Sequence, residues 1–386
     1  MAMTPDAGRP WDLAVVGGGP GGAMTAWRAA RLGLRVVVLE QGKFPRDKVC
    51  GEFVSAEALE LLAEAAPSAV AEAPAIAAVA WVTRSGRRGD FALPAPGRAI
   101  SRWRLDAALW AAAGACGAER RGGARAKAWH SENGANGRLE YETPDGRPAE
   151  LRARALVMAA GRWWRMEGLG GGAAGARPGA AWVGLKAHIR GVQAPSLEMF
   201  ALDNGYCGLA PMEGGEVNVC ALVRSPPQEL AGCRDLTHWL GVHSAPLGER
   251  LHGAAMAWPP QVTAPVFLGG PRRRSPRVFW VGDAGEFADP FTGSGLARAM
   301  LAGALAAEIA AAELAADGDL SRAAARHAAA ARAATRQARR WSGGLRRWLT
   351  APPAWQNAAA AALAHGPLGR ELAARTRWDA AAARRR

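Results

Sequence analysis

Residues 11–40, from Trp11 to Glu40, read WDLAVVGGGPGGAMTAWRAARLGLRVVVLE. The apolar run Leu13–Val16 predicts a buried parallel strand, and the helical spacing of apolar residues from Pro20 to Leu32 predicts a helix. A second buried strand is expected at Arg35–Leu39. A strand, a glycine-rich turn, a helix and another strand, in this order, indicate a Rossmann-type βαβ unit. The sequence therefore predicts an α/β fold.

The turn contains Gly17, Gly19 and Gly22 in the spacing G-x-G-x-x-G. The first glycine permits the tight turn, the second lets the backbone approach a pyrophosphate, and the third lets the helix pack close to the strand. The helix that begins at Pro20 presents its first amide groups to the phosphates. Glu40 follows Gly17 by 23 residues, where a carboxylate can accept hydrogen bonds from ribose hydroxyls. An ADP-containing dinucleotide is expected here, and this stretch alone leaves FAD and NAD(P) open.

The composition limits the number of domains and the class to which the protein can belong. The 386 residues, 49% of them hydrophobic and 48 of them glycine, suffice for one large or two ordinary domains. No run of 18 apolar residues occurs and no signal-peptide pattern precedes Trp11, so a cytoplasmic protein is expected. The five cysteines form no C-x-x-C pair, which favours reduced thiols. No metal site is expected, because His238, His243 and His252 match no zinc-binding spacing.

Most of the net charge of +14 lies near the C-terminal end, where residues 321–386 hold 14 arginines and two acidic residues, a balance of +12. Such a tail suits an anionic membrane surface or an acidic carrier protein, and a solvated helical face is the alternative. Trp341, Leu345, Trp348 and Leu349 fall at helical spacing among these arginines, which fits either a peripheral membrane face or packing on the protein body. Nucleic acid is disfavoured as a partner, because aromatic residues are not interleaved with basic groups in the core.

The polar loop after the second strand contains Arg46, Lys48, Cys50, Gly51 and Glu52. This spacing resembles the R-x-K-x-C-G-[GE] loop of the geranylgeranyl reductase family of FAD-dependent oxidoreductases. That family is related to the aromatic-ring flavin monooxygenases, which share the p-hydroxybenzoate hydroxylase fold. The resemblance implies that this loop lies beside a flavin. It also implies that Cys50 neighbours the flavin, with either a catalytic or a packing role.

Two further motifs carry the same resemblance. Arg102, Leu105 and Asp106 match an R-x-x-[LF]-D element whose arginine reaches the cofactor in that family. A second signature, G-D-x…D-P-x-x-G-x-G, is matched by Gly282, Asp283, Asp289, Pro290, Gly293 and Gly295. The resemblance implies that Asp283 binds the ribityl chain and that the glycine-rich helix start lies against the flavin ring. Plain NAD dehydrogenases have no such second signature, so FAD is the expected cofactor.

The sequence also departs from these relatives. Ala160 stands where the monooxygenases usually have the aspartate of A-D-G, which argues against direct NADPH-driven hydroxylation. In the family's Y-x-W-x-F-P substrate motif only Tyr206 and Pro211 match, and Gly208 and Ala210 replace the bulky aromatics, which predicts a roomier pocket. The chain also resembles oxidoreductases found beside polyketide synthases, which implies an aromatic or polyketide substrate. The G-x-W-x-W-x-I-P motif of flavin halogenases is absent.

The remaining patterns predict the rest of the architecture. Strands are expected at 77–83, 91–93, 124–130, 139–143, 151–159, 181–190, 197–202, 206–210, 216–223 and 277–281. Helices are expected at 55–65, 100–113 and 296–315, and from 319 onwards with breaks at 342–344, 352–353 and 366–367. The predicted fold is a Rossmann-type, glutathione-reductase-like FAD-binding domain with an antiparallel-sheet substrate domain and a helical C-terminal extension. The FAD-binding domain is assigned to 1–75, 100–165 and 266–318, the substrate domain to 76–99 and 166–265, and the basic helical region to 319–386.

These motifs predict an FAD-dependent oxidoreductase that acts at a carbon–carbon double bond of a lipophilic unsaturated or aromatic molecule. The alternatives are an FAD-dependent monooxygenase that hydroxylates an aromatic or polyketide substrate and, in another class, a nucleic-acid- or anionic-membrane-binding protein with a structural dinucleotide. NAD(P)H, reduced ferredoxin and quinol are the candidate electron donors. The candidate catalytic residues are Cys50 and Tyr206, and the candidate cofactor-binding residues are Gly17, Gly19, Pro20, Gly22, Glu40, Arg46, Lys48, Arg102, Gly282, Asp283, Pro290, Gly293 and Gly295.

Overall fold

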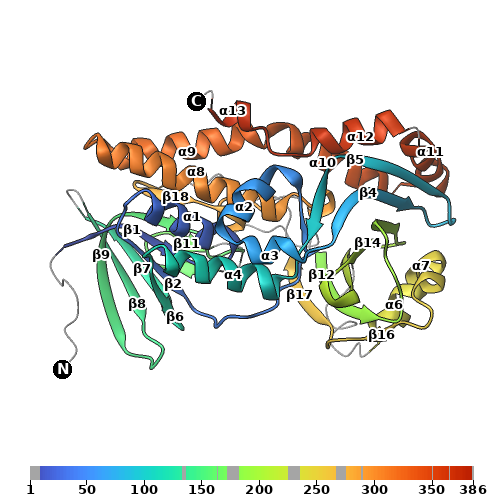
Figure 1. Cartoon of the computed structure of the whole chain (residues 1–386), viewed down its shortest axis with the longest axis horizontal. Coiled ribbons are helices and arrows are strands. Elements are labelled where there is room, and N and C mark those ends of the chain that lie inside the picture. The colour runs from blue at the N-terminus through green and yellow to red at the C-terminus, as the bar shows by residue number, and fades with distance from the viewer. Residues whose placement is uncertain are drawn as a thin grey trace.

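The computed structural model describes residues 9–132, 136–162, 164–171, 182–224, 235–266, 275–287, 290–349, 351–364 and 366–384. Two large sheets lie beside each other, and long C-terminal helices run along one side of both (Figure 1). Asp289 of the second signature and Cys233 lie outside the described residues.

The first sheet is built around β1 (Trp11–Val16), where Leu13 lies opposite Val36 on one side and Ala155 on the other. Its parallel strands are β6 (Glu119–Gly122), β2 (Val36–Glu40), β1, β9 (Pro148–Met158) and β18 (Val278–Trp280). β7 (Arg125–Ser131) and β8 (Gly137–Glu142) form an antiparallel meander with β9. Because the parallel strands end at the same edge, this edge gathers the glycine-rich turn, Glu40 and the loop after β18.

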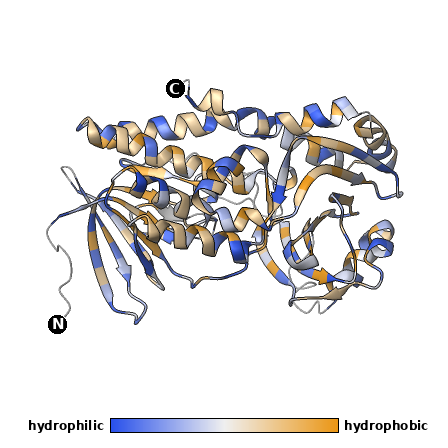
Figure 2. Ribbon diagram, in the orientation of Figure 1, coloured by the Kyte–Doolittle hydropathy of each residue, from blue (hydrophilic) through white to orange (hydrophobic). Residues whose placement is uncertain are grey.

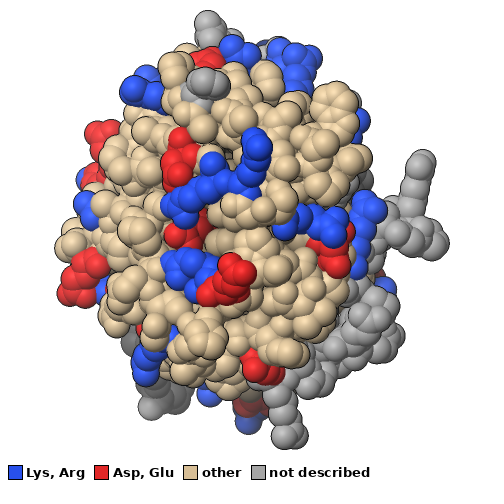
Figure 3. Space-filling model, turned by 90° about the vertical axis from the view of Figure 1, so that its right-hand side faces the viewer, with Lys and Arg blue, Asp and Glu red and all other residues tan. Residues whose placement is uncertain are grey.

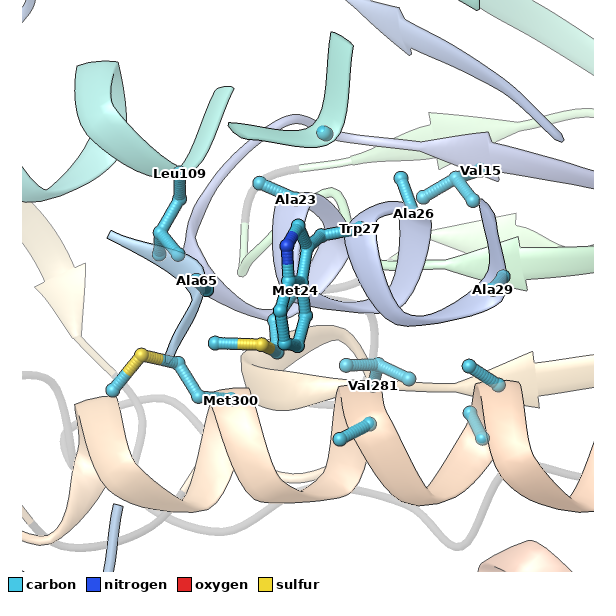
Figure 4. Close-up of a cluster of buried hydrophobic side chains, with 14 of the residues drawn as sticks. Val15, Ala23, Met24, Ala26, Trp27, Ala29, Ala65, Leu109, Val281 and Met300 are labelled. Carbon is cyan, nitrogen blue, oxygen red and sulfur yellow. The ribbon is translucent and has the colours of Figure 1, made fainter. Parts of the chain in front are cut away.

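Alternate residues of β1 face two different layers of the core. Leu13 and Val15 belong to the cluster shared with α1 (Pro20–Arg31), α4 (Arg102–Ala115) and α8 (Gly295–Ala315), whereas Ala14 and Val16 face the meander. Figure 4 shows Trp27 of α1 pointing toward α8, near Val281 and Met300. This two-sided burial explains why the strand reads as a continuous apolar run.

The second sheet contains β3 (Phe53–Val54), β4 (Ala75–Val82), β5 (Arg88–Ala99), β12 (Trp182–Arg190), β13 (Leu197–Ala201), β14 (Gly205–Pro211), β15 (Val217–Val223), β16 (Ala255–Met256) and β17 (Gln261–Val266). Its pairs are antiparallel except for β4 and β13, which run in parallel. The predicted antiparallel sheet is thus confirmed, with one parallel pair where β4, from the N-terminal part of the chain, lies beside β13.

Helices cover the second sheet on both sides. α6 (Leu236–His243) and α7 (Ala245–Arg250) pack their leucines against one face, and α11 (Pro353–Ala364) and α12 (Gly366–Arg375) lie on β5. Apolar residues follow the faces that pack together, and hydrophilic residues recur along the outer C-terminal helices (Figure 2). The remaining short elements are α2 (Leu59–Ala65), α3 (Pro67–Ala71), β10 (Arg165–Met166) and β11 (Gly170–Gly171).

The C-terminal region is helical, as predicted, with one error. α9 (Leu320–Ala334), α10 (Arg336–Leu349) and α13 (Ala380–Arg384) join α11 and α12, and α10 continues through the predicted break at Ser342-Gly343-Gly344. Glycine only weakly disfavours a helix, and Ser342 donates its hydroxyl hydrogen to Ala338 O at 2.7 Å within the helix. The helix predicted at 55–65 is shorter, because 56–58 form a 3₁₀ turn before α2.

Within the part of the chain that the structure describes, one helix, α8, is long and apolar enough to cross a membrane, but half of its most apolar window is buried in the protein. It packs between α1 and α9 in the core of the first sheet. The fold as a whole confirms the predicted combination of a Rossmann-type unit, a mainly antiparallel second sheet and a helical extension.

Candidate cofactor and substrate site

A cavity of about 1070 Å³ extends between the two sheets. Every candidate residue predicted from the sequence lines it except Gly22: Gly17, Gly19, Pro20, Glu40, Arg46, Lys48, Cys50, Arg102, Tyr206, Gly282, Asp283, Pro290, Gly293 and Gly295. The cavity has the size expected of a site for a large cofactor. Segments nearly 280 residues apart in the chain therefore meet at one place.

Two glycines of the turn allow close packing that a side chain would prevent. Gly17 has a φ of +101°, and a Cβ there would lie 2.4 Å from Ala159 O. A Cβ on Gly22 would lie 1.8 Å from Gly17 O, so this glycine holds the helix against the turn and does not face the cavity. The spacing of the turn is thus fixed by contacts within the first sheet.

Two helix N-termini point their free amide groups into the cavity. α1 begins at Pro20 after Gly19, and α8 begins at Gly295 after Ser294, and neither has a capping side chain or an acidic residue in its first turn. Uncapped N-terminal amides carry partial positive charge and bind anions such as phosphates. This arrangement fits an anionic dinucleotide whose two ends lie near different helices.

Glu40 is held in place before any ligand arrives. Its Oε2 accepts hydrogen bonds from Gly18 N at 2.8 Å and Arg46 Nη2 at 2.8 Å, and its Oε1 accepts from Gly42 N at 2.7 Å. Although burial opposes ionisation, the bonds from Arg46 lower the pKa of Glu40, so the carboxylate stays charged. Burial, and then the charge of Arg46, lower the pKa of Lys48 beside it.

Arg102 and Cys50 share another part of the cavity wall. Arg102 bonds Asp106 with Nε and Nη2 at 2.7 and 2.6 Å, and Nη2 is 3.9 Å from where a Cβ on Gly19 would lie. Burial opposes the charge, but Asp106 raises the pKa of Arg102, which stays cationic beside the glycine turn. Burial also raises the pKa of the Cys50 thiol, more than the charge of Arg102 lowers it. Cys50 is therefore a protonated thiol at neutral pH.

Asp283 lines the cavity from the loop after β18. Burial raises its pKa, which Arg162, Arg298 and Arg102 partly offset, and Arg162 Nε is 3.8 Å from its Oδ2. Gly293, with a φ of +65°, turns the chain into α8 against Phe53. A carboxyl group surrounded by cations next to a helix N-terminus suits contacts with the hydroxyl groups of a ribityl chain.

The second sheet closes the cavity with apolar side chains. Tyr206 packs edge-on against Phe291, with ring centroids 5.3 Å apart. Gly208 lies opposite Met199 in the sheet, and a Cβ there would be 3.1 Å from the Met199 sulfur. Met199 therefore takes up part of the space that the missing aromatic at position 208 would fill.

The sequence reasoning missed three charged residues beside the site. Glu52, Lys186 and His188 are buried together between the loop before β3 and the strand β12. In the sequence Glu52 stands out only as the last residue of the Cys50 motif. The available signal was two basic residues, spaced by two, inside the otherwise apolar run of β12.

Comparison with known proteins agrees with this site. A family model described as an FAD binding domain matches residues 11–219, more than half of the chain, beginning at β1. The protein belongs to this FAD binding domain family. It is an FAD-dependent oxidoreductase, as the two signatures predicted.

Several curated relatives are reductases. A menaquinone reductase of Mycolicibacterium smegmatis is 28% identical over 329 residues, which cover 76% of this chain and 75% of the relative. Digeranylgeranylglycerophospholipid reductase 1 of Methanopyrus kandleri is 28% identical over 318 residues, which cover 77% of this chain and 79% of the relative. These likenesses confirm the resemblance to the geranylgeranyl reductase family.

Solved structures share the fold over nearly the whole chain. A geranylgeranyl bacteriochlorophyll reductase-like protein from Thermoplasma acidophilum aligns with a TM-score of 0.76 and 20% identity, over 98% of this chain and 95% of the other. A flavin-dependent brominase aligns with a TM-score of 0.74 and 19% identity, over 95% and 93% of the two chains. At this identity the likeness concerns the fold alone.

Proposed function

We propose that the protein reduces a carbon–carbon double bond of a lipophilic substrate of isoprenoid or quinone type. The observation that carries this proposal is the set of apolar side chains that line the cavity, together with the protonated thiol of Cys50, which lines it too. These apolar side chains include Phe53, Leu197, Met199, Tyr206, Leu222, Val266, Phe287 and Phe291. The curated relatives with reductase names support the same chemistry.

Within this proposal the first sheet belongs to an FAD-binding domain and most of the second sheet to a substrate domain, with the boundaries predicted from the sequence; β3 is a strand that the FAD-binding segment 1–75 contributes to the second sheet. FAD, when bound and reduced, supplies the hydride. The residues assigned to it act by position and charge: the amides of α1 and α8 and the guanidinium of Arg102 attract its negative charge. Cys50 Sγ holds a proton at the cavity wall, and Tyr206 with Phe291 shapes the space for the substrate.

An anaerobic single-turnover experiment tests the proposal. The FAD-loaded protein is reduced with dithionite and mixed with geranylgeraniol, and the flavin absorption and product mass are followed. We expect return of the oxidised flavin bands and a product with two more hydrogen atoms. Cys50→Ala should keep FAD and slow this step by about 100-fold, whereas Cys116→Ala, at the end of α4, should not. A product that has gained oxygen, formed only in air, would instead support the monooxygenase alternative.

The electron donor is tested by a separate titration. Ala160 lines the cavity where the monooxygenase relatives carry an aspartate, so we propose a donor other than NADPH. Flavin bands that stay unbleached with NADPH but bleach with reduced ferredoxin or a quinol would support this. Bleaching by NADPH would contradict it and strengthen the monooxygenase alternative.

We also propose that the C-terminal helices meet an anionic membrane surface from the cytoplasmic side. Trp348, Trp355 and Leu368, on the adjoining helices α10 to α12, are 51%, 64% and 46% exposed. In contrast, Trp341 is partly buried and has Arg375 over its ring, so one side of α10 packs on the protein body. On the end of the molecule drawn in Figure 3, Lys and Arg gather along the upper rim, and both signs mix below it.

Exposed tryptophan with arginine is the composition of an interfacial helix face. Vesicles of phosphatidylglycerol should therefore bind the protein, and vesicles of phosphatidylcholine should not. The double variant Trp348→Ser, Trp355→Ser should lose most of this binding, whereas Trp103→Ser, exposed on α4, should retain it. If the wild type and both variants bind phosphatidylglycerol vesicles equally, or if none of them binds, the basic helices instead pack on the protein or bind an acidic protein partner.

A further inference from the structure

β12 presents two basic side chains to the loop that carries the Cys50 motif. Leu185, Ala187 and Ile189 of this strand point into the apolar cluster with α6 and α7. Lys186 and His188 therefore point the other way, because successive residues of a strand face opposite sides. They are 1% and 8% exposed, although Gly184 on the same face lines the cavity.

Glu52 joins the two basic residues. Its side chain is fully buried, and its φ of +58° is unusual for a residue with a Cβ. Oε1 accepts hydrogen bonds from Lys186 Nζ and from Arg102 N, each at 2.6 Å, and Oε2 lies 2.7 Å from His188 Nε2. Every bond of this carboxylate thus leads to an element that borders the site.

The connection reaches water at one end and the cavity at the other. His188 Nδ1 lies 3.0 Å from Glu216 Oε2, and the Glu216 side chain is 12% exposed. Glu216 is also bonded by Arg190, whose side chain is 66% exposed at the end of β12. At the inner end, Lys186 donates a hydrogen bond to Asp47, which lines the cavity together with Glu52.

The arrangement is costly for folding alone. Taking charges out of water carries a penalty of several kcal/mol per ion, and well-packed apolar residues often replace such buried pairs without loss of stability. With Lys186 and His188 protonated, the three carboxylates Asp47, Glu52 and Glu216 leave the group with one negative charge. One additional proton can therefore be held within the chain of bonds.

We propose that Glu216, His188, Glu52, Lys186 and Asp47 form a proton path from the partly exposed Glu216, just before β15, into the cavity. The inference rests on the proposed function, since saturating a double bond adds one hydride and one proton. The hydride, with both electrons, comes from the reduced cofactor. One proton enters from water at Glu216, and each link passes one proton inward. One proton leaves Asp47 into the cavity that Cys50 also lines, where it replaces the proton that Cys50 gives to the substrate. The path returns to its starting state.

The protonation of His188 gives a readout that needs no turnover. Burial disfavours its charge, but Glu52 and Glu216 raise the pKa of His188 despite the nearby charge of Lys186. Nitrogen NMR of the whole protein, with His188→Gln to assign the signal, should find an imidazolium at neutral pH. Glu52→Gln should lower that pKa, and Glu198→Gln, which removes a buried carboxylate of β13 paired with Arg250, should leave it unchanged. A neutral His188 at neutral pH would overturn the path.

The rate of alkene reduction distinguishes a role of His188 in proton transfer from a purely structural role. With dithionite-reduced protein and geranylgeraniol, His188→Gln should be about 10- to 100-fold slower and should show a larger solvent deuterium isotope effect. Added substituted imidazoles should restore the reduction rate of His188→Ala, and the restored rate should depend on the pKa of the imidazole. A purely structural role of His188 predicts no such dependence. If the wild type reduces the alkene and His188→Gln matches it with an unchanged isotope effect, the path is wrong and the proposed function stands. If the wild type fails to reduce it, the proposed function fails, and the NMR measurement still decides the path.

Discussion

Gly18 donates its amide hydrogen to Glu40 Oε2 across 2.8 Å, although 22 residues separate the two in the chain. The glycine-rich turn and the acid at the end of β2 are therefore one rigid unit. Arg46 and Gly42 occupy the other positions on the carboxylate, so a ribose hydroxyl must compete with or displace Arg46. The geometry makes Glu40 an organiser of the turn as well as the expected ribose ligand.

Replacing this carboxylate should weaken FAD binding. Glu40→Gln removes the charge that holds Arg46 and Gly18, and bonds to charged groups contribute about 1.5–3 kcal/mol each. We expect FAD affinity to fall by about 10- to 100-fold, measured by fluorescence titration of the apoprotein. The control is Glu308→Gln. Glu308 lies on α8, is half-exposed and pairs with Arg28 of α1, so this variant should bind FAD as tightly as the wild type. Equal affinity of Glu40→Gln and wild type would contradict this assignment.

Two helical glycines should respond to alanine in opposite directions. A Cβ on Gly303 of α8 would lie 2.3 Å from Gly21 O, whereas a Cβ on Gly343 of α10 meets nothing within 4 Å. Gly303→Ala should force α8 away from α1 and lower the free energy of unfolding by about 1–3 kcal/mol. Gly343→Ala should raise it by about 0.5–1 kcal/mol through helix propensity. Urea denaturation measures both, and a stabilising Gly303→Ala would disprove the close packing of α1 and α8.

Met199 should set how wide a substrate the cavity accepts. It lines the cavity opposite Gly208, where the related substrate motif carries a bulky aromatic. Met199→Ala should increase the relative kcat/KM for a ring-bearing quinone over a linear polyprenyl alcohol, at a cost of about 2 kcal/mol in stability. Met256→Ala, on β16 away from the cavity lining, is the matched control. An unchanged substrate ratio would show that Met199 does not limit the pocket.

The elements around Gly17 and Asp283 were predictable because their apolar runs and glycines follow from close packing and phosphate contact. β5 was harder, since Pro94, Pro96 and Gly97 look like a loop. The strand nevertheless runs over Arg88–Ala99, because α11 and α12 lie on it and Gly97 passes close to Phe53. Tertiary packing here overrides local propensity.

The site was only partly predictable for a similar reason. Motif spacing pointed to the residues that line the cavity, but it contained no information on the partners of Glu52. Lys186 and His188 lie more than 130 residues from Glu52 in the chain, and only the pairing of β12 with its neighbours brings them to it. α6 and α7 were also missed, because each is shorter than a clear helical period requires.

Because His327 is buried, the free energy of unfolding should fall in mild acid. It is fully buried on α9, its Nε2 is 2.9 Å from Ala302 O, and burial lowers its pKa to about 4. Because the folded pKa lies below the unfolded value of about 6.5, the unfolded state binds the proton first. The neutral, buried His327 therefore makes its full contribution to the free energy of unfolding above about pH 6.5, and this contribution is lost as pH falls toward 4. The expected loss is roughly 2 kcal/mol between about pH 7 and about pH 5.

Urea denaturation at both pH values measures this loss. His327→Gln keeps a hydrogen-bond donor for Ala302 O without a titrating ring, so its unfolding free energy should change less over the same interval. Other acid-sensitive groups are common to both proteins and cancel in the difference between them. Parallel pH dependences of the wild type and His327→Gln would show that the folded protein protonates His327 as readily as the unfolded chain does, which would contradict the lowered pKa.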